Sequence, residues 1–305
     1  MNETKWKNFV LKTGLPLEYE VIKIINSIGF RCNGEFPYIK ENENGFNTEF
    51  SIDIWAETDL KNINIENNIS VSCLIECKYS HRGISWLFMP NNNPSSNYLI
   101  KIVDHNSSVF DSQHSIEKSF LKRNKFNYCF KGIEIHQNDA SDFIIKKGIS
   151  QLKYALPNIA SNYLDIHYHV DPTSIAIILP ILVTTADIFL LNKNVTIDDI
   201  YNTDIISSIA QLQDAIILSN LEDPLVERYS EKIIIDFLNK NESFEKDFNS
   251  IYKLKYPDTF ESSSNYFLRF FRGISREILI CNLNSLYSII QSFVKSIKKG
   301  IFDEV

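Results

Sequence analysis

The segment from Val71 to Tyr79 restricts the possible folds of this chain more than any other part of the sequence. Its apolar residues alternate with a second set, which consists of Ser72, Leu74, Glu76 and Lys78. Successive side chains of a strand point to opposite faces of a sheet, so this period of two predicts a β-strand with one strongly apolar face. Glu76 and Lys78 are expected to share the other face.

The residues around this strand predict a mixed α/β core. Before it, apolar spacing indicates a helix from Leu15 to Ile28 that ends at Gly29. Two strands joined by the polar run Glu41 to Gly45 are expected next, over Phe30–Ile39 and Phe46–Ala56. Residues from about 80 to 135 include an Asn-, Pro- and Ser-rich stretch and are expected to form an irregular insertion.

The second half of the chain is expected to complete the core and extend it. A helix is predicted from Asp142 to Leu156, where Pro157 would end it. Strands are predicted over Asn162–Val170 and Ser174–Val183, and helices over Leu225–Asn239, Phe244–Tyr252 and Asn265–Lys299. We therefore expect one compound domain, with a core over residues 1–200 and a mostly helical extension over residues 201–305.

Composition favours a globular, cytoplasmic protein. Of 305 residues, 44% are hydrophobic and 12% aromatic, which is enough for a sizeable core. The five cysteines are an odd number without a CxxC pair, so reduced thiols are expected. The longest apolar stretch, Ile175 to Leu191, is interrupted by Pro180 and Asp187, so no membrane span is expected.

The charge balance argues against strong non-specific binding to nucleic acid. The formal net charge is -7, whereas affinity for a phosphate backbone comes from clustered Lys and Arg. Contact with nucleic acid would therefore be local. The candidate patches are Lys122, Arg123 and Lys125, then Lys146, Lys147 and Lys153, and finally Arg269, Arg272 and Arg276.

Two strand-like segments carry the residues that hydrolysis of a phosphodiester would need. Asp53 lies within Phe50-Ser51-Ile52-Asp53-Ile54, and Glu76 and Lys78 lie within Ile75-Glu76-Cys77-Lys78. Carboxylate oxygens are the ligands that hard divalent cations prefer, and a lysine beside them can orient the attacking water. This spacing indicates a metal-dependent hydrolytic centre.

These residues resemble the PD-(D/E)xK phosphodiesterase superfamily, and within it the Mrr-like restriction endonucleases, over roughly the first 190 residues. Asp53 in its Ile-Asp-Ile context and Ile75-Glu76-Cys77-Lys78 carry most of the likeness. Glu18, which precedes the Gly29-Phe30 pair by about three helical turns, is similar to an acidic residue of the family. Gln151, in the segment from Gly148 to Ala155, resembles a glutamine of the family's later helix.

The resemblance implies a restriction-endonuclease-like fold: a mixed central sheet flanked by helices, here with a helical C-terminal extension. It also implies that Asp53, Glu76 and the Cys77 carbonyl bind Mg²⁺ or Mn²⁺, and that Lys78 orients the attacking water or helps to deprotonate it. Glu18 would be an additional contact to the metal or the water, while Gln151 and Lys153 would contact nucleic acid. The implied activity is an endonuclease acting on DNA in restriction or anti-phage defence. A homodimer and a partner protein of a defence system are further expectations.

Other interpretations stay open at this point. The chain could be a catalytically silent subunit that binds nucleic acid or protein, or a nuclease directed at RNA. The carboxylates of Asp53 and Glu76 beside Lys78 could simply form a salt bridge that links two strands. A rival metal centre is offered by Asp165, His167, His169 and Asp171 on one face of the strand predicted over Asn162–Val170.

Overall fold

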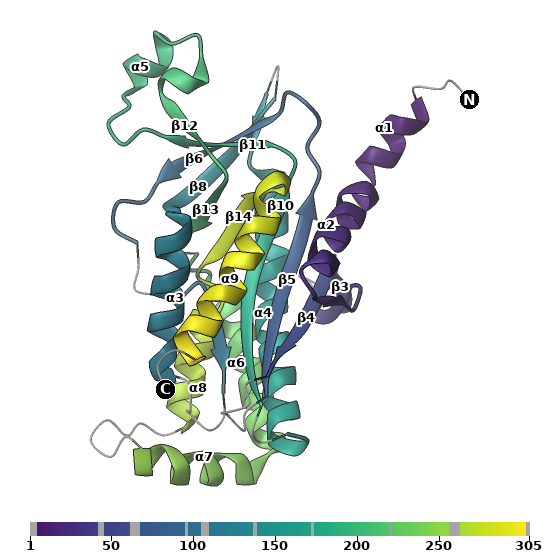
Figure 1. Ribbon diagram of the computed structural model, residues 1–305, viewed down its shortest axis with the longest axis vertical. Coiled ribbons are helices and arrows are strands. Elements are labelled where there is room, and N and C mark those ends of the chain that lie inside the picture. Colours follow the sequence, from purple (N-terminus) through teal and green to yellow (C-terminus); the bar gives the residue numbers. More distant parts are fainter. Residues whose placement is uncertain are drawn as a thin grey trace.

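The computed structural model describes residues 5–41, 46–61, 68–94, 97–104, 110–136, 139–171, 174–219, 221–255 and 263–302. These residues form a mixed α/β protein in which helices cover both faces of one large sheet (Figure 1). The expected mixed sheet flanked by helices is therefore present. Residues 42–45 of the predicted connection between two strands lie outside the described part of the chain.

Strands and helices alternate irregularly along the chain. The strands are β1 (Arg31–Cys32), β2 (Phe36–Glu41), β3 (Asn47–Ile52), β4 (Ile54–Leu60), β5 (Ile69–Lys78), β6 (Ser85–Pro90), β7 (Lys101–Val103), β8 (Asn127–Ile135), β9 (Ala140–Ser141), β10 (Ile175–Thr184), β11 (Asp187–Leu191), β12 (Ala210–Gln213), β13 (Ala215–Leu218) and β14 (Ile278–Asn282). The helices are α1 (Lys5–Lys12), α2 (Leu15–Ser27), α3 (Phe110–Asn124), α4 (Phe143–His169), α5 (Ile197–Tyr201), α6 (Pro224–Lys240), α7 (Glu242–Lys255), α8 (Ser263–Gly273) and α9 (Leu286–Phe302).

Strands β4, β5 and β10 lie side by side in the sheet. The described residues give it the order β1-β4-β5-β10-β14-β13-β8-β6-β11-β12, with β7 beside β10 and β9 beside β8. β4 is antiparallel to β5, and β10 is parallel to β5 from Ile175 opposite Ile69 to Thr184 opposite Lys78. Every residue of β10 is buried, as expected for a central strand covered on both faces. β2 and β3 form a separate antiparallel hairpin.

Two apolar clusters lie on opposite faces of the sheet. Alternate residues of β5 belong to each of them: Cys73 and Ile75 pack with α2 and α9, whereas Leu74 packs with α4. In Figure 1, α2 and α9 lie in front of the sheet and α4 lies behind it. The predicted alternation over Val71–Tyr79 therefore corresponds to β5, although the face that carries Glu76 and Lys78 is covered by a helix rather than by solvent.

Helix α4 corrects the prediction that a helix ends at Pro157 and a strand follows it. The helix continues through Pro157 to His169, so the strand expected over Asn162–Val170 is wrong. Proline cannot donate the backbone hydrogen bond that the carbonyl of Lys153 would otherwise accept. The hydroxyl of Ser275 donates to that carbonyl instead, at 2.8 Å. A side chain from a distant part of the chain therefore stabilises the helix across its proline.

The region expected to be an irregular insertion contains regular structure. It includes β6, β7, α3 and β8, and its side chains Trp86, Phe88 and Phe120 are fully buried. The polar stretch after Pro90 occupies only the connection between β6 and β7. Burial of these aromatic rings stabilises the segment in a way that its polar composition does not reveal.

The helical extension expected after residue 200 contributes strands to the central sheet. β14 interrupts the helix predicted over Asn265–Lys299, pairs parallel with β10 and antiparallel with β13, and separates α8 from α9. Its residues Ile278 to Cys281 are consecutively buried. Such an apolar run is typical of a strand covered on both faces. The C-terminal part of the chain therefore contributes strands to the core, in addition to helices that pack on it.

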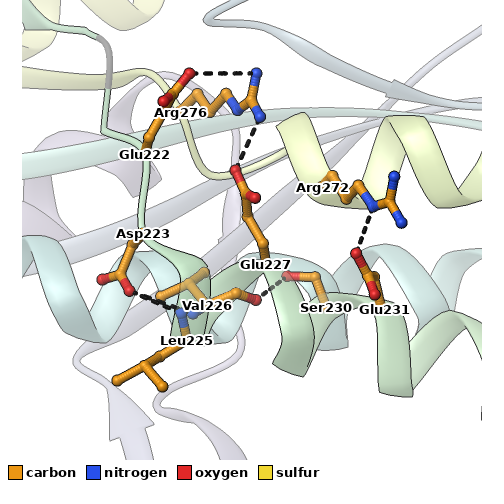
Figure 2. Close-up of polar contacts among 9 residues, drawn as sticks. All are labelled: Glu222, Asp223, Leu225, Val226, Glu227, Ser230, Glu231, Arg272 and Arg276. Carbon is orange, nitrogen blue, oxygen red and sulfur yellow. Dashed lines mark hydrogen bonds and ion pairs between the residues drawn. The ribbon is translucent and has the colours of Figure 1, made fainter.

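Helix α6 is attached to the chain segment that leads into β14 by ion pairs. The Asp223 carboxylate caps its first turn by accepting the backbone amide of Leu225 at 3.1 Å. Further along the helix, Glu227 lies 2.8 Å from Arg276, and Glu231 contacts Arg272 (Figure 2). Two members of the predicted basic patch, Arg272 and Arg276, are therefore paired with carboxylates.

The cysteines are all free thiols; Cys32 is half-buried and the other four are buried. Burial raises the pKa of each thiol, which keeps them protonated near neutral pH. Within the described ranges, no helix combines the length and the apolar character that crossing a bilayer requires.

Candidate active site

The register of β4 and β5 brings Asp53 beside Glu76. Ile54, the first residue of β4, lies opposite Ile75, so the residue before Ile54 adjoins the residue after Ile75. Asp53 occupies the break between β3 and β4, where the chain leaves the hairpin and enters the central sheet. Two carboxylates that are 23 positions apart in the sequence thus become neighbours.

Asp53 is held by the main chain of β5. Its Oδ2 accepts a 2.7 Å hydrogen bond from the backbone amide of Cys77. Burial raises the pKa of Asp53, and the amide of Cys77 and the Lys78 ammonium oppose that shift. The geometry fixes one oxygen of the carboxylate.

Glu76 is a fully buried carboxylate with one unsatisfied oxygen. Its exposed fraction is 0%. Oε1 contacts the Lys78 ammonium, whereas Oε2 has no hydrogen-bond partner within the described part of the chain. Burial first, and the neighbouring Asp53 carboxylate second, raise the pKa of Glu76 to about 8. A buried carboxyl oxygen without a partner is uncommon in folded proteins, and a water molecule or a cation would satisfy it.

Lys78 is fixed by two oxygens. Besides Glu76, its Nζ donates a 3.1 Å hydrogen bond to Oε1 of Gln151 on α4. The amide of Gln151 in turn donates to the carbonyl of Ser51 at 3.2 Å. An ammonium group has three N–H donors, so one remains for a water molecule or a substrate oxygen. Gln151, for which the resemblance implies a contact with nucleic acid, is thus bonded directly to the lysine of the candidate centre.

Glu18 approaches the same place from α2, on the other side of the strand end. Its pKa is raised by burial and by the carboxylates of Asp53 and Glu35, and Lys78 opposes the shift. Glu35 precedes β2 and also raises the pKa of Asp53. The cluster therefore contains more carboxylates than cations, and their mutual repulsion favours binding of a positive ion.

Gly148 and Glu35 are parts of this site that sequence reasoning did not identify. A Cβ atom on Gly148 would lie 2.7 Å from Cδ1 of Leu182 and 3.1 Å from Cε of Lys78. Glycine therefore allows α4 to lie against the Lys78 side chain. The spacing Gly148 to Gln151, one helical turn, was the available signal, because both residues then face β5.

Lys153 lies away from the centre. Its side chain is largely buried and its Nζ is 3.1 Å from Oδ2 of Asp223, the residue that caps α6. Contact between Lys153 and nucleic acid would require this ion pair to open. Its contact with nucleic acid stays a prediction. In the structure, Lys153 binds Asp223 and so connects α4 to the start of α6.

The two histidines of the rival centre lie on different sides of α4. Residues two apart on a helix do not face each other, and the strand that would have aligned them is absent from this part of the chain. His167 is buried beside Tyr163, whereas exposed His169 interacts with Asn241 at 2.7 Å and lies 3.7 Å from Asp165. Within the described ranges, these residues form no group that could hold a metal ion.

The donor set at Asp53 and Glu76 fits a divalent cation in composition. The orphaned Oε2 of Glu76 and the excess of carboxylates both favour one. Within the described residues, no group of three or more His, Cys, Asp or Glu side chains is arranged to hold a metal ion. The expected set is smaller, since it consists of two carboxylates and the main-chain carbonyl of Cys77.

Comparisons with protein-family models, with curated proteins and with solved structures found no match to this chain.

Proposed function

We propose that this protein is a metal-dependent nuclease with a restriction-endonuclease-like core, hydrolysing phosphodiester bonds in DNA. One observation carries the proposal: Asp53 and Glu76 adjoin each other on neighbouring strands, and Lys78 beside them keeps one N–H donor free. The succession of α2, β3, β4, β5, α4 and a β10 parallel to β5 is compatible with that core. Neither feature depends on the resemblance in sequence.

Asp53, Glu76 and the carbonyl of Cys77 would hold Mg²⁺ or Mn²⁺. Such an ion neutralises charge on the phosphoryl oxygens and makes a bound water more acidic. Hard cations prefer carboxylate and carbonyl oxygens, which are the donors that this site offers.

The remaining residues would orient the attacking water. The free N–H of Lys78 can donate to the water or to a phosphoryl oxygen, while Glu76 and Gln151 fix the direction of the ammonium. Gln151 is itself held by the Ser51 carbonyl, so the lysine is positioned by two strands and a helix. Glu18, whose pKa burial raises, can accept a proton at the rim of the site.

The test is cleavage of linear, circular and single-stranded DNA, with RNA in parallel, in Mg²⁺, Mn²⁺ or EDTA. Asp53→Ala and Lys78→Ala would be compared with the exposed controls Asp204→Ala and Lys298→Ala. We expect cutting that requires the metal, that the controls retain and that both site variants lose.

Three results would redirect the proposal. Cutting that survives Asp53→Ala and Lys78→Ala would overturn the assignment of the site. Cutting of RNA alone would make the substrate RNA. Binding of nucleic acid without cutting under any of these conditions would favour the catalytically silent subunit.

A further inference from the structure

A groove of about 870 Å³ lies on the α4 side of the molecule, next to the candidate active site. Its walls are the β2–β3 hairpin and helix α6, and Tyr154 and Asn158 of α4 form its floor. Tyr229 of α6 donates a 2.7 Å hydrogen bond to the carbonyl of Ile39 and accepts one of 2.8 Å from Asn158. These bonds connect both walls and the floor, so the groove is preformed.

The groove is continuous with the candidate active site through residues on shared elements. Tyr154 lies one helical turn after Gln151, which contacts Lys78. Phe50 lines the groove, and the next residue, Ser51, accepts the amide of Gln151 at 3.2 Å. Tyr38 lies between the two regions. Its ring stacks on Phe50 of the groove, and it is close enough to Glu76 of the candidate site for that carboxylate to raise its pKa, in addition to the larger effect of burial.

The groove is lined by cations in an otherwise acidic protein. Lys40 comes from the hairpin, and Arg228 and Lys232 come from α6. Glu41 and Asp236 also line it, and Lys232 lies 3.9 Å from Glu41. No carboxylate of the described residues lies within ion-pair distance of Arg228. The local balance is therefore positive, although the whole chain has a net charge of -7.

Two carboxylates of helix α6 are directed away from the groove. Glu227 and Glu231, four residues apart, point toward Arg276 and Arg272 and are neutralised there (Figure 2). Arg228 and Lys232, also four residues apart, face the groove. Asp236 of the same helix does line the groove, and Lys232 lies 3.9 Å from Glu41, so Arg228 is the groove cation of α6 without an ion-pair partner among the described residues.

The rings beside these cations suit an unpaired base. Phe50 packs on Tyr38, with ring centroids 5.9 Å apart, and the Lys40 ammonium lies 6.0 Å from the centroid of the Phe50 ring, which stays 38% exposed. The Lys40 ammonium lies 3.6 Å from the centroid of Tyr154, which places a positive charge at the floor. Aromatic stacking combined with a positively charged groove is how proteins bind single strands without reading sequence. A duplex keeps its bases stacked internally and cannot use the Phe50 ring.

We propose that this groove binds a single-stranded polynucleotide, whose phosphates contact Arg228 and Lys232 and one of whose bases stacks on Phe50. This inference rests on the proposed function, because it identifies the nuclease substrate as single-stranded. A strand bound in the groove would extend toward Lys78. Binding in the groove does not itself require cleavage, so the two proposals can be tested apart.

The experiment is fluorescence anisotropy of a labelled 20-nucleotide DNA strand, and of the same strand in a duplex, with the full chain in EDTA. The variants are Phe50→Ala and the double variant Arg228→Gln/Lys232→Gln. Lys298→Gln/Lys299→Gln is the matched control, because these exposed lysines lie on α9, across the sheet from the groove.

We expect the single strand to bind more tightly than the duplex, and Phe50→Ala to weaken its binding by about tenfold. The groove double variant should make the slope of log K against log salt less negative by about 1.4, since each phosphate contact with a single strand contributes about −0.7. The control should bind like the wild type.

Equal binding by the wild type and the groove double variant would overturn the inference, as would tighter binding to the duplex or no binding to either DNA. Groove-dependent binding of the single strand without cleavage in Mg²⁺ or Mn²⁺ would support the groove and count against the proposed nuclease. Cleavage by a protein whose DNA binding does not depend on the groove residues would support the proposed nuclease and count against the groove.

Discussion

The side-chain oxygen of Gln151 accepts a 3.1 Å hydrogen bond from Nζ of Lys78, which joins helix α4 to the end of strand β5. The same amide donates to the carbonyl of Ser51, just before Asp53. One glutamine therefore links the lysine of the candidate site to the strand end that carries its first carboxylate. On the proposed function, it positions the ammonium without touching the reacting atoms.

Gln151→Ala should lower kcat for DNA cleavage by roughly tenfold or more, because the Lys78 ammonium loses one of the two contacts that orient it toward the attacking water. The thermal midpoint should change little, because the amide is only partly buried. Asn124→Ala is the matched control: its amide bridges Phe120 and Ser292 at 2.8 Å on the other side of the sheet. Equal kcat in both variants would remove the positioning role.

Gly148→Ala should reduce cleavage more than stability. The added Cβ would lie 2.7 Å from Cδ1 of Leu182 and 3.1 Å from Cε of Lys78, so α4 and the lysine must separate. The higher helix propensity of alanine, about 1 kcal/mol, offsets part of the cost in folding. Cleavage assays and thermal melts of the same preparations measure the two effects.

Gly300→Ala provides the control for this prediction. Its Cβ would lie 2.6 Å from Cγ1 of Ile116, a comparable clash in α9 and away from the site. It should lower stability and leave kcat unchanged. If both glycine variants lose activity in proportion to their stability, Gly148 has only a packing role.

The metal-free protein should lose stability as the pH rises, because burial raises the pKa of Glu76 to about 8 from its ordinary value of 4.5. The folded state then binds a proton that the unfolded state has already released, so the contribution is complete below pH 4.5 and is lost through pH 8. Between pH 6 and pH 8 the loss is about 2 kcal/mol.

Glu76→Gln should remove the part of this pH dependence that Glu76 contributes, because the amide cannot ionise, while Glu277, whose pKa burial also raises, keeps its own part. Urea unfolding in EDTA at several pH values measures it in both proteins. A wild-type stability that is constant over that interval, or that falls equally in Glu76→Gln, would contradict the assignment to Glu76.

Lys153→Gln should destabilise the protein by about 2 kcal/mol, because it breaks the 3.1 Å pair with Asp223 at the start of α6. Its affinity for single-stranded DNA should equal that of the wild type. Exposed Lys147, on the same helix, is the control, and Lys147→Gln should leave stability unchanged. Weaker DNA binding at unchanged stability would instead support the nucleic-acid contact that the sequence predicts for Lys153.

Local patterns predicted the elements whose apolar periodicity and boundaries agree with their burial. Helix α2 and strands β5 and β10 are examples, and the alternation in β5 correctly placed Glu76 and Lys78 on one face. Prediction was wrong where a distant residue supplied what the local sequence lacked. The Ser275 hydroxyl lets α4 continue past Pro157, and pairing with β10 and β13 makes a strand of Ile278–Asn282.

The sequence by itself determined the chemistry available at the candidate site, because the residue types and their alternation along one strand are local properties. Only the tertiary structure decided that Asp53 adjoins Glu76, since that depends on the antiparallel register of β4 and β5. It also decided that Gly148 lies against Lys78, and that Arg228 shares a groove with Phe50. These relationships join residues far apart in the chain, and no local periodicity encodes them because they arise only when the apolar faces pack together.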